Sequence, residues 1–167
     1  MRAGTRGFSL IELLIVVAII LIIAAIAIPN LLRSRIAANQ ASAVGSLRAL
    51  NTAEIAYSTT YGTGYTSYLG YLGPPASGAP LATAAGIIDS VLSGGSPTAS
   101  QSSKSGYRLT YTSGTADPSG RINTYQITAT PLSVGTTGTN FYYTDQSGEI
   151  RQNNTAVAGS SDSPLAG

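Results

Sequence analysis

The sequence is poor in the side chains that most enzymes use. None of its 167 residues is cysteine, histidine or tryptophan, and only 10% are charged. Without cysteine the chain can form neither a disulfide framework nor a thiolate metal site, and without histidine it lacks the commonest general base and metal ligand at neutral pH. No phosphate-binding loop or complete dinucleotide fingerprint occurs. We therefore expect no enzymatic activity and no cofactor.

A strong charge of either sign is absent as well. The nine lysines and arginines nearly balance the seven aspartates and glutamates, for a formal net charge of +2. Net charge therefore gives no electrostatic case for nucleic-acid binding. The length and the absence of an internal repeat fit one folded domain beside a long apolar segment.

This apolar segment dominates the N-terminal part of the chain. Phe, Leu, Ile and Val fill 15 of the 21 positions from Phe8 to Ile28, and Ser9 and Glu12 are the only polar residues among them. As a helix, about 20 such residues span the roughly 30 Å core of a bilayer. Their summed preference for the membrane, about 4 to 9 kcal/mol, exceeds the roughly 3 kcal/mol cost of one acidic side chain. We therefore predict a single membrane span.

The residues at the front of this segment resemble a known processing site. Gly7-Phe8-Ser9-Leu10-Ile11-Glu12-Leu13 is similar to the site of type IV prepilins and of type II secretion pseudopilins. The resemblance implies a leader at residues 1–7 that a prepilin peptidase cuts after Gly7. It also implies N-methylation of Phe8 and a requirement for Glu12 in subunit docking.

The resemblance also bears on charge and orientation. Removal of the leader takes away Arg2 and Arg6 and leaves seven basic and seven acidic residues. Because Arg33 and Arg35 follow the span, the positive-inside rule gives a near tie. The resemblance places the leader in the cytoplasm and the larger part of the chain outside.

Many pilins close a C-terminal loop with a disulfide. This chain has no cysteine, so hydrogen bonding or packing must hold its C-terminus.

An ordinary secretory signal peptide is the alternative for the same segment. Ala25-Ile26-Ala27 looks like a small-x-small cleavage site, and cleavage there would release a secreted binding domain that begins at Ile28. Two features favour the prepilin interpretation. Glu12 lies at the front of the apolar segment, and the segment is longer than the roughly 7 to 15 residues of a signal core.

Beyond the apolar segment the pattern remains helical. Pro29 falls where the family has its helix-kinking proline, and it cannot donate a hydrogen bond to the Ala25 carbonyl, so we expect a kink there. We predict one long helix from about Ser9 to about Tyr57, with residues 8–29 in the membrane or filament core and residues 30–57 as an amphipathic half. Its apolar stripe consists of Ile36, Ala43, Leu47, Leu50 and Tyr57.

Residues 58–105 are expected to form a Tyr- and Gly-rich segment between the helix and a sheet. We predict a short helix at Ala84–Leu92 and a flexible polar loop at Gly94–Ser105. We expect five tyrosines to cover a loop-rich core rather than to form an aromatic binding surface. These are Tyr57, Tyr61, Tyr65, Tyr68 and Tyr71.

The alternation of apolar and polar residues predicts an antiparallel sheet of about four strands in residues 106–153. It is clearest from Tyr107 to Thr112 and from Tyr125 to Ala129, and further strands are expected at Asn140–Thr144 and Glu149–Gln152. The amphipathic half of the helix is the obvious cover for the apolar face. The predicted fold class is therefore α+β, a pilin-like long helix on an antiparallel sheet. Residues 154–167 are expected to form a polar C-terminal tail.

Two weaker signals concern ligands and modification. Asp117, Asp145 and Asp162 offer carboxylate oxygens of the kind that bind calcium, but isolated turn acids are the simpler account, and we predict no metal site. Asn153-Asn154-Thr155 matches a glycosylation triplet.

The resemblance and the residue patterns together predict a structural subunit of a type IV pilus. We expect a single-pass inner-membrane protein before assembly and an extracellular surface filament afterwards. The resemblance implies adhesion, twitching motility or DNA uptake as roles, and it implies homo-oligomerisation, a prepilin peptidase, an assembly ATPase and platform proteins as partners. A pseudopilin of a type II secretion system is the alternative, and filament length in electron micrographs would separate the two.

Overall fold

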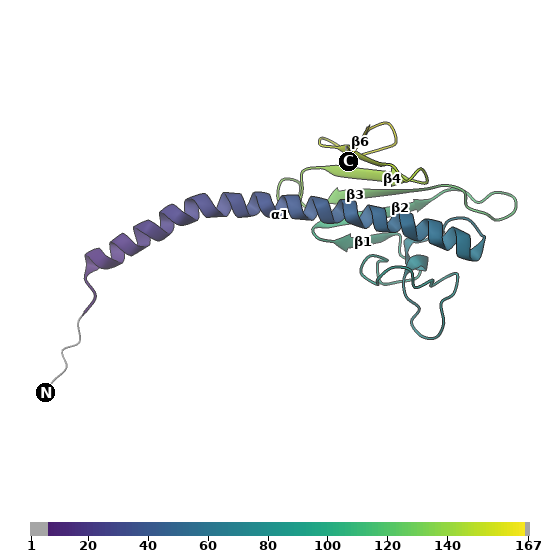
Figure 1. The fold of residues 1–167 in the computed structure, drawn as a ribbon, viewed down its shortest axis with the longest axis horizontal. Coiled ribbons are helices and arrows are strands. Elements are labelled where there is room, and N and C mark those ends of the chain that lie inside the picture. The colour runs from purple at the N-terminus through teal and green to yellow at the C-terminus, as the bar shows by residue number, and fades with distance from the viewer. Residues whose placement is uncertain (1–6, 166–167) are drawn as a thin grey trace. The chain divides into compact units, whose positions relative to one another are not determined.

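The computed structural model describes residues 7–165 of the chain, so the predicted leader lies outside the described residues except for Gly7. The chain divides into two compact units, one up to Arg35 and one from Ile36 onward. The elements, drawn in Figure 1, are α1 (Leu10–Tyr61), the 3-10 helix η1 (Leu69–Leu72), β1 (Gln101–Lys104), β2 (Tyr107–Ser113), β3 (Tyr125–Pro131), β4 (Phe141–Asp145), β5 (Ile150–Asn153) and β6 (Ser163–Pro164).

The helix α1 is continuous and passes through Pro29. Gly62 ends it, because this residue has a φ of +69° and its N–H donates to the Ser58 carbonyl oxygen at 3.0 Å. The helix therefore continues one turn beyond the predicted end at Tyr57.

The unit from Ile36 onward is built on one six-stranded antiparallel sheet in the order β1-β2-β3-β4-β5-β6. The α+β prediction is confirmed, but the sheet has six strands rather than four. The predicted loop at Gly94–Ser105 contains β1, and the predicted tail contains β6. Neither strand carries an alternating pattern, since β1 is polar throughout and β6 has two residues, one of them Pro164.

One face of the sheet packs on the second half of α1, as Figure 1 shows. The predicted alternation in β2 and β3 is confirmed, because the apolar positions of both strands are buried. From the helix side, Leu47 and Leu50 are completely buried against this face. The strand residues of this core cluster are Tyr107, Leu109, Tyr111, Tyr125, Ile127, Ala129, Tyr142 and Ile150.

Turns dominate the connection between α1 and β1. The predicted helix at Ala84–Leu92 is wrong, because Gly86 has a φ of +65° and Asp89 Oδ1 accepts hydrogen bonds from the N–H groups of Val91 and Leu92 in a turn. The tyrosine prediction is confirmed for four of the five rings. Tyr57 belongs to the core cluster, and three others pack against it, namely Tyr61, Tyr65 and Tyr71.

Candidate functional site

The start of α1 brings Ser9 and Glu12 together. The Ser9 backbone N–H donates to Glu12 Oε2 at 2.9 Å, and the Leu13 N–H donates to the Ser9 carbonyl oxygen at 3.3 Å. Ser9 is therefore the N-cap, and Glu12 supplies one half of a capping box by accepting from a backbone donor that the helix leaves free. Glu12 thus has a structural task within its own chain.

The Gly7–Phe8 bond, the predicted cleavage site, lies in open chain before the helix. Phe8 is 82% exposed, and a Cβ built on Gly7 meets no atom within 4 Å. The φ of Gly7 is also outside the left-handed region that favours glycine. Packing and backbone conformation in the described residues therefore do not require glycine at this position.

The apolar side chains that follow are exposed on every side of α1. An 18-residue window of the helix has a mean hydropathy of 3.3, and none of the window is buried. Within residues 7–165, α1 is the one helix that is long and apolar enough to cross a membrane. Soluble monomers rarely expose an apolar surface of this extent, so lipid or other apolar helices must cover it.

Pro29 lies inside α1 rather than at its end. The Asn30 side chain donates from Nδ2 to the Ile26 carbonyl oxygen at 3.1 Å, so its amide is partly satisfied by the helix itself. Pro29 has no N–H to donate to the Ala25 carbonyl. The kink at Pro29 stays a prediction.

The three aspartates considered for calcium each serve their own turn. Asp117 Oδ1 accepts from Ser119 Oγ at 2.6 Å and from the Arg121 N–H at 3.0 Å, and these bonds lower its pKa to about 2. Asp145 Oδ1 accepts from the Ser147 N–H at 2.9 Å. No three acidic side chains gather into a metal-binding group within the described part of the chain.

Asp162 closes the C-terminal segment onto β5. Its Oδ1 accepts from Asn153 Nδ2 at 2.9 Å, its Oδ2 accepts from the Gly159 N–H at 2.7 Å, and its carbonyl accepts from Arg151 Nη1 at 2.9 Å. The Leu165 N–H then donates to the Ile150 carbonyl at 2.7 Å. Hydrogen bonds therefore hold this segment without a disulfide. The amide nitrogen of the glycosylation triplet at Asn153 is already engaged by Asp162.

Glu54 of α1 is fully buried in the unit from Ile36 onward, which we call the head, and it was not predicted from the sequence. Its Oε1 accepts from Thr66 Oγ1 at 2.6 Å and its Oε2 accepts from the Thr66 N–H at 3.0 Å, while the Tyr111 hydroxyl donates to the Thr66 carbonyl at 2.8 Å. Burial raises the pKa of Glu54, and the hydrogen bonds from Thr66 oppose that shift. This carboxyl ties α1 to the beginning of the following loop.

Asn51 makes a second buried polar link. Its Nδ2 donates to Thr144 Oγ1 at 2.8 Å, and its Oδ1 accepts from the Tyr125 hydroxyl at 3.1 Å. Asn51 therefore joins α1 to β3 and β4. The spacing could have identified both residues, because Asn51 follows Leu47 by four positions and Glu54 follows Leu50 by four, which places them on the buried stripe.

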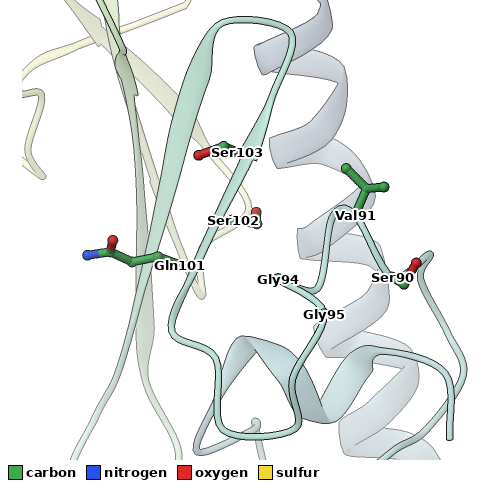
Figure 2. Close-up of a pocket in the computed structure, with 7 residues that line it drawn as sticks. All are labelled: Ser90, Val91, Gly94, Gly95, Gln101, Ser102 and Ser103. Atoms are coloured by element: carbon green, nitrogen blue, oxygen red, sulfur yellow. The ribbon is translucent and has the colours of Figure 1, made fainter. Parts of the chain in front are cut away.

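Figure 2 shows a hollow of about 380 Å³ between β1 and the turn at residues 90–95. Ser102 lines it, is 5% exposed, and its Oγ has no hydrogen-bond partner within residues 7–165. No titratable side chain lines the hollow, so it offers no group for acid–base chemistry. A bound water would satisfy the Ser102 hydroxyl.

Two comparisons with known proteins found similarity over part of the chain. The prokaryotic N-terminal methylation motif matches residues 2–28. The chain is also similar to the type IV major pilin protein PilA of Myxococcus xanthus (strain DK1622), with 57% identity over 49 residues. That match covers 29% of this chain and 22% of the relative, so the chain spans about a fifth of the length of the curated relative that it matches. No solved structure matches.

The matched segment and the described geometry agree with each other. The motif contains the open Gly7–Phe8 bond, the capped helix start and the exposed apolar side chains of α1. Part of this chain is therefore similar to a type IV major pilin, and its N-terminus carries the methylation motif.

Proposed function

We propose that this chain is a structural subunit of a type IV pilus, assembled from the inner membrane into a helical surface filament. The observation that carries the proposal is the methylation motif joined to a helix whose apolar side chains have no cover in the chain itself. A folded head follows the apolar part of that helix, and no group of acidic side chains that could hold a metal occurs in the described residues. Such a chain suits a task of assembly rather than of catalysis.

The precursor is stored with residues 8–29 across the membrane and the leader in the cytoplasm. A prepilin peptidase cuts after Gly7, and Phe8 then receives a methyl group on its new amine. The open chain at Gly7 and the exposure of Phe8 support access for both reactions. Because the fold does not need glycine at position 7, a requirement for it would lie in the peptidase.

Assembly replaces lipid around α1 with other copies of α1. Cleavage gives Phe8 an amine with a reference pKa near 8, which is cationic at neutral pH. Glu12 uses Oε2 for its bond to Ser9, and Oε1 accepts no hydrogen bond from the described residues. That oxygen can receive the Phe8 amine of the same subunit or of a neighbour, and in apolar surroundings such pairing favours one register.

The cellular machinery and the downstream role belong to the same proposal. An assembly ATPase and platform proteins supply the energy and the scaffold for extraction from the membrane. The finished filament acts in adhesion, twitching motility or DNA uptake.

Determination of the mature N-terminus by mass spectrometry tests this function. We expect a chain that begins at a methylated Phe8. A mature chain that begins at Ile28 would show an ordinary signal peptide and a secreted domain, and it would overturn the proposal.

A further inference from the structure

Two arginines follow the apolar part of α1 directly. Arg33 and Arg35 are both exposed, and neither side chain makes a hydrogen bond or an ion pair with any residue in the range 7–165. The apolar side chains reach up to them, since Leu31 is 69% exposed and Leu32 is 50% exposed. Two cations without a partner thus stand at the end of an uncovered apolar surface.

The geometry of the helix limits what can bind these cations. Two positions along an α-helix rotate a side chain by about 200° and raise it by about 3 Å. Arg33 and Arg35 therefore lie on opposite sides of α1 at nearly the same height. A protein surface contacts one side of a helix, whereas the headgroup layer of a bilayer surrounds a helix at one level.

The distance from Arg33 to the other end of the apolar segment also fits a bilayer. Glu12 and Arg33 are separated by about 32 Å along the helix axis, or about 30 Å along the membrane normal at a usual tilt of about 20°. This equals the thickness of a bilayer core, which is about 30 Å. Asn30, one turn before Arg33, donates its amide to the Ile26 carbonyl and so is partly satisfied before the headgroup layer is reached.

We propose that Arg33 and Arg35, the arginine pair, bind anionic phospholipid headgroups at the outer face of the membrane and so set the depth of α1. This depth places Glu12 and the Gly7–Phe8 bond at the opposite face, where the leader emerges. The inference rests on the proposed membrane-spanning precursor. It adds a lipid partner and gives two residues outside the processing motif a positioning role.

The depth of α1, measured on the full, uncleaved chain in vesicles, tests the role of the arginine pair. Because the chain has no cysteine, Ser34→Cys gives a single site for an environment-sensitive fluorophore between the two arginines. In vesicles that contain phosphatidylglycerol, we expect the Arg33→Gln/Arg35→Gln pair to reduce iodide quenching of this label about threefold, because residue 34 moves into the hydrocarbon. The difference should be smaller in pure phosphatidylcholine.

Matched controls separate the possible outcomes. Arg48→Gln/Arg108→Gln removes the same charge from exposed positions of the head and should leave the quenching unchanged. Equal quenching with and without the arginine pair would show that the pair does not set the depth of α1. An equal difference in both lipids would show that anionic headgroups are not its partner, and either result would overturn the proposal. A label at Ala18→Cys that iodide reaches in every vesicle would instead show that the span itself is not inserted, and the proposed function would fail.

Discussion

At the scale of single residues, Glu54 has the most unusual surroundings. Its carboxyl is fully buried, and burial raises its pKa above the ordinary value of 4.5. A carboxyl with a raised pKa in the folded state binds its proton more tightly there than in the unfolded state. The stability that it contributes is therefore fully present below the unfolded pKa and is lost as pH rises through the folded pKa.

We expect the free energy of unfolding of the full chain in detergent to fall as pH rises above 4.5 toward neutrality, and to stay level in Glu54→Gln. Asp117 and Asp145 do not contribute to this slope, because their pKa values are lowered and they titrate below the window. Urea denaturation at several pH values measures the effect. Glu149→Gln, an exposed matched change, should keep the slope, and the account of Glu54 is wrong if Glu54→Gln keeps it too.

Substitution of Asn51 tests the buried hydrogen bonds that join α1 to β3 and β4. In Asn51→Ala the Tyr125 hydroxyl and Thr144 Oγ1 both lose a buried partner, so we expect a loss of about 3 kcal/mol in the free energy of unfolding. Thr52→Ala, at the next and exposed position, should cost less than about 1 kcal/mol. Denaturant titration of both variants measures the difference, and equal losses would contradict the buried role of Asn51.

At the scale of elements, the Asp162 carboxylate accepts two of the hydrogen bonds that hold the C-terminal segment. Asp162→Ala removes the acceptor for Asn153 Nδ2 and for the Gly159 N–H, so β6 should separate from β5. We expect hydrogen exchange at the Leu165 N–H to become at least about tenfold faster, because a lost hydrogen bond of about 1.4 kcal/mol corresponds to that factor. Ser161→Ala serves as the exposed neighbouring control. Unchanged exchange in Asp162→Ala would show that the Asp162 carboxylate does not hold β6 on β5.

The elements also show how far the sequence could predict the structure. The β2 and β3 strands were predictable because Tyr107, Leu109 and Tyr111 alternate with polar residues, and only one register buries them all. The β1 strand was missed because Gln101–Lys104 has no apolar residue to indicate a face. Its place depends on pairing with β2, which is a long-range contact that local pattern does not encode.

In the candidate site, too, contiguous residues were predictable and long-range contacts were not. The motif from Gly7 to Glu12 was visible in the sequence because its residues are contiguous. The bond from the Ser9 N–H to Glu12 fits the three-residue spacing of a capping box, but it was not predicted. The bonds of Glu54 to Thr66 were not predictable, since they depend on the path of an irregular loop.

At the scale of the whole molecule, Glu12 caps α1 within its own chain, and we propose that it also pairs with the Phe8 amine of another chain. Glu12→Gln keeps an oxygen that can accept from the Ser9 N–H but removes the charge that attracts the Phe8 amine. We expect normal leader removal in this variant and a filament yield at least about tenfold lower, because one charge-assisted bond contributes about 1.5 to 3 kcal/mol. Immunoblots of precursor and mature chain, together with sheared filament yield, measure both effects. Unchanged yield would contradict the pairing.

We propose that the apolar half of α1 first spans the membrane and then packs against the same segment of other copies. Electron cryomicroscopy of purified filaments would show where this segment lies. We expect residues 10–28 of each copy to pack against those of other copies at the filament axis, with the heads outside. Filaments in which these residues face solvent and only the heads meet at the axis would contradict it.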